Sequence, residues 1–232
     1  GIFGMSFKLE LSTRPKKAMG DLALWNQAEA SLAESLDEFI GAGKWKVNPG
    51  DGAFYGPKID FHLRDCLGRT WQCGTIQLDF QMPLNFNLEY VDVDGSRKRP
   101  IMIHRVCYGS IERFIGILTE QFAGAFPLWL SPDQVVVLPI SEKFNDYAQK
   151  VAEFLNGSDI RAEIDDRNEK IGRKIRDNEL KRIPYLLIVG EKEEAEGLVS
   201  VRAQGEGDKG QMTLEEYKDY MVGLVKAEME AN

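Results

Sequence analysis

A chain of 232 residues, 43% hydrophobic and 28% charged, is long enough for one large domain or two small ones with real cores. Its net charge of -8 argues against indiscriminate nucleic-acid binding, so any such contact must be local. No apolar run is long enough to span a bilayer, and the start of the chain lacks the pattern of a secretory leader. Three cysteines without C-x-x-C spacing favour reduced thiols in an intracellular protein: Cys66, Cys73 and Cys107.

The first elements predict a strand followed by a helix. Residues 6–12 alternate, which predicts a strand with Phe7, Leu9 and Leu11 on one face. Because this strand starts so close to Gly1, we expect the domain to begin upstream of the sequence. A helix follows the cap at Asp21 and ends at the next glycines. Its predicted buried stripe comprises Trp25, Ala28, Leu32, Leu36 and Phe39.

Residues 58–64 and 69–80 form two alternating runs joined by a short turn, which predicts an antiparallel hairpin. Strict alternation places Lys58, Asp60 and His62 on one face of the first run. On the second run it separates one set (Trp71, Cys73, Thr75, Gln77, Asp79) from the other (Gln72, Gly74, Ile76, Leu78). Such polar faces are either solvated or hold a ligand. The glycines in and beside the hairpin allow close backbone approach and favour a ligand platform: Gly52, Gly56 and Gly74.

Residues 100–124 predict a buried strand that delivers His104, followed by a helix. Arg113 lies in the first turn of this helix, away from its apolar stripe, where the helix dipole disfavours a cation. The arginine therefore either forms an ion pair with Glu112 or Glu120, or lies near an anionic ligand. By itself, a lone histidine on a strand is usually a core residue. The predicted apolar stripe comprises Ile111, Phe114, Ile115, Leu118 and Phe122.

Two prolines within residues 125–132 predict a boundary, after which strands and helices alternate. This order predicts an α/β domain with parallel strand pairs covered by helices. The predicted strands are residues 134–140, 160–164, 184–189 and 198–202, and the predicted helices are 144–155, 168–180 and 213–229. Residues 167–182 hold seven basic and three acidic side chains, which indicates either a local RNA-binding cluster or a solvated helix face with paired charges.

Six strings, in order along the chain, resemble threonyl-tRNA synthetases: ELSTRP, GDGAFYGPKID, WQCGTIQLDF, MIHR, GSIERFIGILTE and DRNEKIGRKIR. The resemblance implies an α+β catalytic portion on an antiparallel sheet over residues 1–132, including the third class II motif. It also implies an α/β anticodon-binding domain with a mixed sheet over residues 133–232.

The resemblance also implies roles for individual residues. His104 matches a zinc ligand, and zinc can distinguish threonine from isosteric valine because the metal can bind the hydroxyl. Arg113 matches the arginine that holds ATP, and Lys58 could stabilise charge on the α-phosphate. The other substrate- or ATP-binding positions are Tyr55, Gln72, Thr75, Gln77 and Ser110. The positions that match anticodon readers are Asn168, Lys170, Arg176, Glu193 and Arg202, a mixture suited to unstacked RNA bases.

The implied activity is ATP-dependent activation of threonine and its transfer to threonine tRNA, with Mg2+ on the phosphates, in a homodimer without membrane association. The first two motifs of the family, two further zinc ligands and an editing domain have no match here. We therefore expect the chain to be a C-terminal part that does not activate threonine alone. The alternative is a non-catalytic tRNA-binding or regulatory protein derived from a synthetase. A cytoplasmic location is expected, with a mitochondrial one left open.

Overall fold

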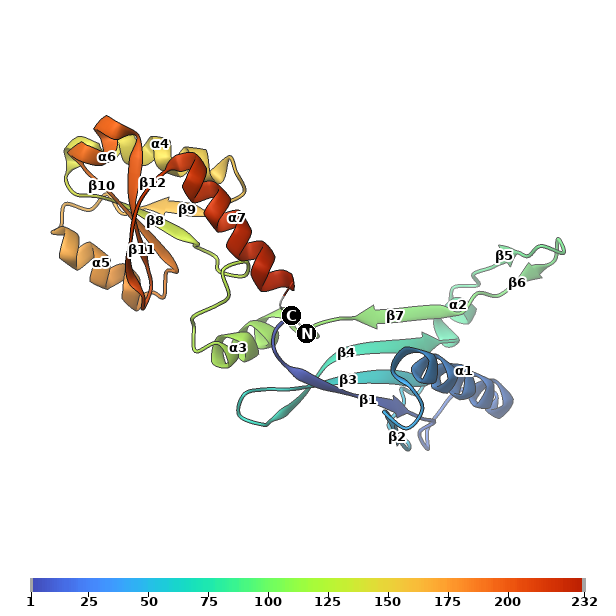
Figure 1. The fold of residues 1–232 in the computed structure, drawn as a ribbon. Helices are drawn as coiled ribbons and strands as arrows, with labels where there is room; N and C mark the ends of the chain where they lie inside the picture. The colour runs from blue at the N-terminus through green and yellow to red at the C-terminus, as the bar shows by residue number, and fades with distance from the viewer. Residues whose placement is uncertain (1, 231–232) are drawn as a thin grey trace. The chain divides into compact units, whose positions relative to one another are not determined.

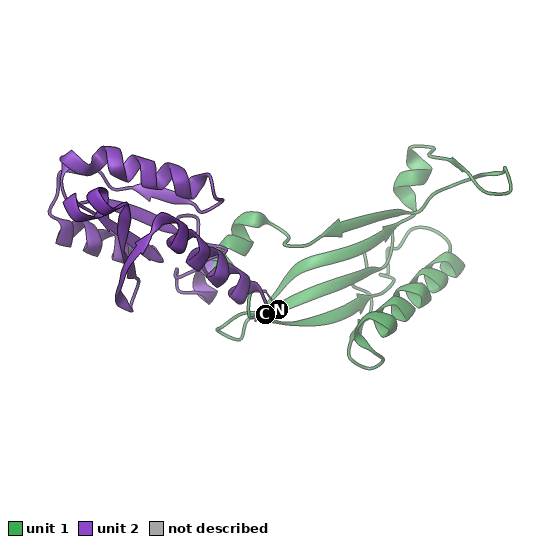
Figure 2. Cartoon of the chain, turned by 45° about the horizontal axis from the view of Figure 1, so that its top comes forward, with its two compact units in different colours: residues 1, 3–118 green, residues 2, 119–232 purple. Residues whose placement is uncertain are grey.

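The structure, a computed structural model, describes residues 2–230. The chain divides into two compact units, whose division in the sequence falls between Leu118 and Thr119 (Figure 2). This point lies within helix α3 (Ile111–Gln121). The two units are described separately below.

Unit 1 is built on a five-stranded sheet with the order β2-β1-β3-β4-β7. Its strands pair antiparallel except for β1 and β2, which are parallel, so the predicted antiparallel sheet is confirmed apart from the unpredicted β2. Helix α1 (Leu22–Ile40) packs on one face of this sheet through a leucine-rich core (Figure 1). The strands are β1 (Ser6–Ser12), β2 (Lys46–Asn48), β3 (Lys58–Arg64), β4 (Thr70–Asp79) and β7 (Met102–Val106).

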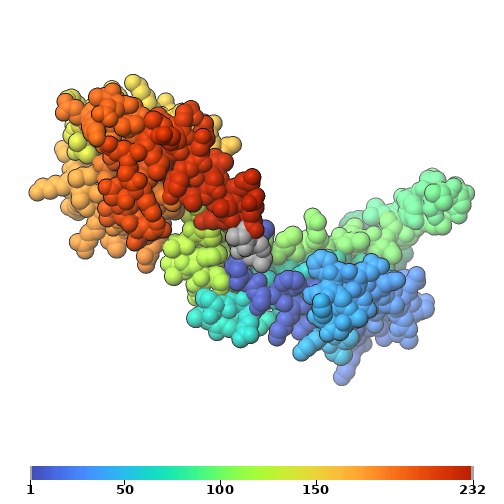
Figure 3. Space-filling model, in the orientation of Figure 1, coloured from blue at the N-terminus to red at the C-terminus, as the bar shows by residue number. Residues whose placement is uncertain are grey.

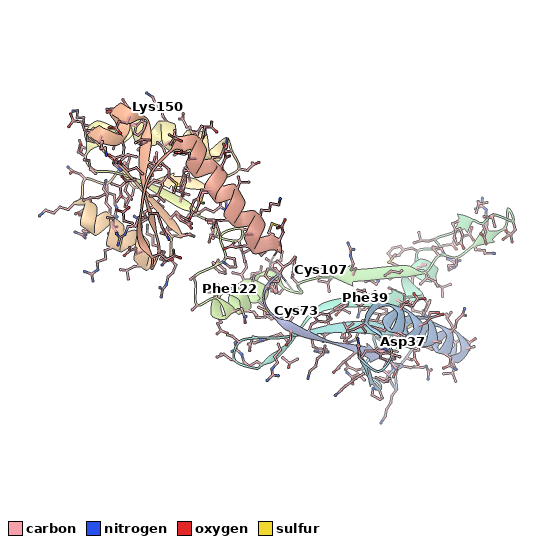
Figure 4. All side chains as sticks on the ribbon, in the orientation of Figure 1. Asp37, Phe39, Cys73, Cys107, Phe122 and Lys150 are labelled. Carbon is pink, nitrogen blue, oxygen red and sulfur yellow. The ribbon has the colours of Figure 1, made fainter. Side chains whose placement is uncertain are left out.

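Helix α1 begins and ends where the sequence predicts. The Asp21 side chain accepts a hydrogen bond from the Ala23 amide at 3.1 Å, and Gly41 ends the helix with φ of 97°. The predicted burial of Phe39 is wrong, because its side chain is 72% exposed (Figure 4). Ile40 packs against the core instead. Helical periodicity predicts which side of a helix is buried only to within about one residue. Tertiary contacts then decide which side chain of the last turn is buried.

Strand β7 is an edge strand, so the prediction of a buried strand is wrong. It pairs only with β4 among the described strands, and Ile101 and Ile103 are exposed. An apolar run cannot by itself reveal whether a strand has one neighbour or two. Before β7, the short helix α2 (Gln81–Asn85) leads into the hairpin of β5 (Tyr90–Val91) and β6 (Arg97–Lys98), which projects from the rest of unit 1 (Figure 3).

Helix α3 forms as predicted but buries a different stripe. Phe114, Ile117 and Leu118 are its buried residues, whereas Ile111 and Ile115 are more than half exposed, and Phe122 follows its end. The ring of Phe114 stacks on that of Tyr108 with centroids 4.6 Å apart. The Phe114 ring also packs edge-on against that of Phe3, with centroids 5.3 Å apart, so a residue far away in the chain helps to bury Phe114.

Unit 2 is an α/β unit with a mixed sheet, as predicted, and its strand order is β12-β11-β10-β8-β9. Strands β9, β8 and β10 are parallel, and β11 and β12 extend the sheet antiparallel. One core involves α4 and α7, and the other involves α5, so these helices cover opposite faces. The strands are β8 (Val135–Pro139), β9 (Ala162–Ile164), β10 (Tyr185–Val189), β11 (Leu198–Ala203) and β12 (Gly207–Thr213).

The helices of unit 2 are α4 (Asn145–Asn156), α5 (Ile171–Leu180), α6 (Glu191–Glu196) and α7 (Leu214–Glu230). The capping box predicted for α7 is confirmed: the Glu216 carboxylate accepts from the Thr213 amide, and the Thr213 hydroxyl accepts from the Glu216 amide. Strand β12 and helix α6 are not predicted, because their short, glycine- or glutamate-rich segments lack apolar periodicity. Within residues 2–230, no helix has both the length and the apolar character required to cross a membrane.

A buried carboxylate anchors the segment before α5. Asp165 accepts hydrogen bonds from the Arg167 guanidinium at 2.7 and 2.8 Å and from the Asn178 amide at 2.9 Å. The hydrogen bonds from Arg167 lower the pKa of Asp165 from 3.8 to about 2, against the opposing effect of burial. Because the folded-state pKa is depressed, this carboxylate stabilises unit 2 above the unfolded value and ceases to do so as the pH falls towards 2.

We therefore predict that the free-energy difference between the wild type and Asp165→Asn shrinks as the pH falls from about 5 to about 2. Hydrogen exchange of the β8 and β10 amides at each pH measures the free energy of unfolding of unit 2 in both proteins. Asp166→Asn, at an exposed neighbouring carboxylate, is the control and should follow the wild type. A difference for Asp165→Asn that does not vary with pH would contradict the assignment.

Candidate functional site

A bulge in the β3–β4 hairpin brings the polar side chains of unit 1 onto one face. Phe61 pairs with Gly74 and His62 with Gln72, so Cys73 is an extra residue in β4. Strict alternation separates Gln72 from Thr75 and is wrong here. The bulge returns Gln72 to the same face, where its amide donates to the Thr75 hydroxyl at 3.1 Å. Figure 4 shows Cys73 on this strand, and it is buried.

The loop before β3 lies directly on β4. A Cβ atom added to Gly56 would lie 1.9 Å from the Leu78 carbonyl oxygen, so only glycine allows this approach. The loop places the Tyr55 hydroxyl 2.9 Å from Gln77 Oε1, to which it donates. The ring centroids of Tyr55 and His104 lie 6.0 Å apart. Burial, and to a smaller extent the negative charge of Asp79, raise the pKa of Tyr55. Gln77 and His104 are direct cross-strand partners, so these three predicted residues come together.

His104 is oriented by a buried carboxylate that the sequence analysis did not single out. Its Nε2 lies 2.8 Å from Asp79 Oδ2, and Asp79 also accepts from the amides of Gln81 and Met82. Burial opposes ionisation of Asp79, but these donors outweigh it and lower its pKa. Asp79 is therefore an acceptor, and the tautomer of a neutral His104 ring that matches it has the proton on Nε2 and the lone pair on Nδ1.

The side chains near His104 show how far this chain could bind zinc. Protein zinc sites use three or four side-chain ligands. Among residues 2–230, no group of three or more histidine, cysteine, aspartate or glutamate side chains could hold a metal ion. The imidazole of His104, with Nδ1 as its remaining donor atom, fits one ligand position, and the described residues do not complete a zinc site.

The phosphate-binding candidate Lys58 is buried against a second carboxylate, Asp60. The Lys58 ammonium is hydrogen-bonded to Asp60 and lies 3.4 Å from the exposed carboxylate of Asp51. Asp60 also accepts from Gln72 at 2.5 Å and from Thr75 at 3.2 Å. Three residues predicted to contact substrates therefore meet at an aspartate that was not predicted.

Arg113 reaches from the start of α3 to the hairpin. Its Nη2 donates to the Gln72 carbonyl oxygen at 2.7 Å. Of the two predicted ion-pair partners, Glu112 and Glu120, Glu112 accepts from the Ser110 hydroxyl at 2.8 Å and does not contact the Arg113 guanidinium. Ser110 also lies 3.3 Å from the Arg113 amide, so its hydroxyl is engaged within the helix start. Gly109 has φ of 68° and passes so close to Arg113 that a side chain there would collide with it.

In unit 2, three predicted RNA-contacting residues are associated with the face covered by α5. Arg202 pairs in register with Leu186, which packs in the core that involves α5. Arg202 Nε lies 3.0 Å from Glu179 Oε1, and Arg176 lines the same depression. Ser200, two residues before Arg202, lies on the same face and donates to Glu193.

The Glu193 carboxylate is held at the start of α6. Its oxygens accept from the Ser200 hydroxyl at 2.8 Å, the Gln211 amide at 2.8 Å and the Gly190 amide at 3.0 Å. Burial opposes ionisation, but the hydrogen bond from Ser200 and the other donors lower the pKa of Glu193. The group is thus an ionised acceptor on a surface that also carries arginines, an arrangement that can read base edges as well as bind phosphates.

The basic cluster of residues 167–182 is only partly available to a ligand. Lys174 is buried and donates to the Pro139 carbonyl oxygen at 3.0 Å, and Arg173 pairs with Glu169 four residues earlier. Among the described residues, Lys170 and Arg176 form no ion pair and are exposed. Lys170 is the N-cap of α5, and Asn168 lies in a depression beside Arg167 and Lys174. Internal pairing therefore accounts for Lys174 and Arg173, whereas RNA contact by Lys170 and Arg176 stays a prediction.

Comparisons with known proteins agree with this architecture. A family model described as "tRNA synthetase class II core domain (G, H, P, S and T)" matches residues 2–122, and one described as "Anticodon binding domain" matches residues 134–224. The chain therefore belongs to the family of class II aminoacyl-tRNA synthetase core domains. The match to an anticodon-binding domain follows this core along the chain.

Three similar proteins are named as threonine--tRNA ligases or as a threonyl-tRNA synthetase. The chain is 59% identical to a threonine--tRNA ligase of Syntrophomonas wolfei, over 97% of this chain and 35% of that protein. It is 61% identical to one of Caldanaerobacter subterraneus, over 93% of this chain and 33% of that protein. The RNA-binding domain structure of threonyl-tRNA synthetase from Cryptosporidium parvum covers 96% of this chain and 56% of its own, with 41% identity and a TM-score of 0.85. The chain spans about a third of the length of the curated relatives.

We predict that Gly56→Ala destabilises unit 1 by about 1–3 kcal/mol, because the new methyl group collides with the backbone of Leu78. The displaced loop should also break the hydrogen bond between Tyr55 and Gln77. Urea denaturation measures the change in stability, and near-ultraviolet circular dichroism of tyrosine reports the change around Tyr55. The control is Gly116→Ala within α3, where the added methyl group meets nothing within 4 Å and should leave stability unchanged or higher. Equal stability of the two variants would contradict the close approach.

Proposed function

We propose that this chain belongs to a threonine–tRNA ligase, which activates threonine with ATP and transfers it to threonine tRNA. The observation that carries the proposal is about 60% identity to threonine--tRNA ligases over nearly the whole chain. The joint polar surface of β3, β4 and β7 in unit 1, defined by Tyr55, Lys58, Gln72, Thr75, Gln77 and His104, supports it.

In this proposal Lys58 and Arg113 act on the phosphates of ATP. The Lys58 ammonium has three N–H donors and two carboxylate neighbours, Asp60 and Asp51, so one donor remains for the α-phosphate. That donor would stabilise negative charge as the threonine carboxylate attacks and pyrophosphate leaves. The planar guanidinium of Arg113, held above the Gln72 backbone, would bind phosphate oxygens and support the adenine. Gln72 and Thr75 would contact the adenosine.

Threonine would bind beside Tyr55, Gln77 and Ser110, where His104 contributes one ligand to a zinc ion. When bound, zinc would coordinate the amino and hydroxyl groups of threonine and so exclude valine. The contribution of this chain is to hold the His104 ring, through Asp79, with Nδ1 unprotonated. Mg2+ would accompany ATP, as the class II core implies.

Unit 2 would read the anticodon through Asn168, Lys170, Arg176, Glu193 and Arg202. Two exposed cations and one ionised carboxylate suit local contact with RNA in a chain whose net charge is -8. We propose a boundary between the catalytic part, residues 1–132, and the anticodon-binding part, residues 133–232, since the matched family ranges end at 122 and resume at 134. A homodimer in the cytoplasm completes the proposal.

Arg113→Lys should weaken binding of ATP with Mg2+ by about tenfold, because an ammonium cannot combine bidentate phosphate contact with support of the adenine. Isothermal titration calorimetry on this chain measures the affinity. Arg105→Lys is a matched control on β7, since Arg105 lines an apolar depression with Phe61 and Ile76 on the opposite side of the sheet from Gln77 and His104. Equal losses in both variants, or an affinity unchanged by Arg113→Lys, would contradict the role of Arg113.

Charge reversal at Lys170 and Arg176 should weaken binding of threonine tRNA by about tenfold at low salt and make its salt dependence shallower. A filter-binding assay measures the affinity at several salt concentrations. Lys150→Glu is the control, because Lys150 is exposed on α4, which covers the other face of the sheet (Figure 4). Unchanged binding by Lys170→Glu and Arg176→Glu, or an equal loss with Lys150→Glu, would count against anticodon recognition by the α5 face.

A further inference from the structure

Asp60 is the point at which four side chains from three strands meet. Its side chain is 1% exposed. Oδ2 accepts from the Ser12 hydroxyl of β1 at 2.7 Å and from the Lys58 ammonium of β3. Oδ1 accepts from the Gln72 amide at 2.5 Å and from the Thr75 hydroxyl at 3.2 Å, both on β4. Each oxygen therefore has two donors, which uses the full capacity of a carboxylate.

All four partners of Asp60 donate to it. These bonds determine which donor or acceptor atoms of Lys58, Gln72 and Thr75 remain for a ligand. The Gln72 amide nitrogen uses one hydrogen for Asp60 and the other for the Thr75 hydroxyl, so the remaining polar atom of the side chain is its acceptor Oε1. The Thr75 hydroxyl donates to Asp60 and accepts from Gln72. Lys58, with Asp60 and Asp51 as neighbours, retains a single N–H donor.

We infer that Asp60 is a positioning residue for the nucleotide-binding surface of β3 and β4. It touches no substrate itself but fixes the rotamers and the donor–acceptor polarity of Lys58, Gln72 and Thr75 before the ligand arrives. This inference rests on the proposed function, which assigns those three residues to ATP. A lysine and a glutamine that are already ordered lose little side-chain freedom on binding, so more of their interaction energy appears as affinity.

The same carboxylate connects Lys58 to Arg113 through one residue. Gln72 is held at its side chain by Asp60 and at its carbonyl oxygen by Arg113. Ser12 holds Asp60 from the neighbouring strand β1, whose register places Ser12 opposite Lys58. The candidate phosphate-binding lysine and arginine are therefore placed by a single chain of hydrogen bonds, with Asp60 as its buried member.

Nuclear magnetic resonance of the Gln72 side-chain amide tests this network directly on the whole chain. In the wild type we expect two well-separated amide protons that exchange slowly with water, because both are hydrogen-bonded. Ser12→Ala removes one donor without changing the charge and should leave the protein folded, with partly increased exchange at Gln72. Asp51→Asn removes the exposed neighbour of Lys58 and should leave the Gln72 signals unchanged. Rapid exchange in the wild type would overturn the inference without any variant.

Adenosine is the ligand for the second measurement, since it carries no phosphate that would respond to the altered charge near Lys58. Asp60→Asn should weaken adenosine binding by about fivefold or more, the effect of a lost oriented hydrogen bond, and Asp60→Glu should restore part of it. Unaltered affinity in Asp60→Asn with increased exchange at Gln72 would overturn the positioning role. If the wild type binds no adenosine while Gln72 remains protected, the proposed nucleotide site fails and the network stands as purely structural.

Discussion

The pairing of β3 with β4, interrupted by one extra residue at Cys73, is the constraint on which the candidate site depends. Without the bulge, the period of two would turn Gln72 to the face of Ile76 and away from Thr75. With it, the side chains opposite Lys58, Asp60 and His62 all belong to one polar surface. The close passage of Gly56 over the Leu78 carbonyl then adds the loop with Tyr55 to the same surface.

Two buried aspartates organise this surface, and each binds the side chains of one half of it. Asp60 gathers Lys58, Gln72 and Thr75, whereas Asp79 orients His104 and accepts from two backbone amides at the start of α2. A buried carboxylate is costly unless donors surround it, so each aspartate requires its partners as much as it places them. In the proposed function, the half around Asp60 would bind ATP and the half around Asp79 would bind threonine.

Unit 2 matches an anticodon-binding domain, and the RNA contact proposed for it would be local, because the chain as a whole is acidic. Part of the basic cluster is used internally, as with Lys174 on the Pro139 carbonyl and Arg167 on Asp165. These bonds hold α5 so that Lys170 and Arg176 stay exposed. Glu193 adds a hydrogen-bond acceptor, and in the proposed function this mixture would favour particular base edges over general attraction to phosphates.

The sequence by itself determined the order of the elements, the hairpin, the caps of α1 and α7, and the resemblance that identified most candidate residues. These features follow from local periodicity, turn chemistry and strings of neighbouring residues. Only the tertiary structure decided that β7 is an edge, that α3 buries Ile117 and exposes Ile111 and Ile115, and that Gln72 faces Thr75. Asp60 also emerged only there, although alternation already placed it between Lys58 and His62. Strand number, helix rotation and a bulge depend on residues distant in the chain, and a local pattern carries no information about such partners.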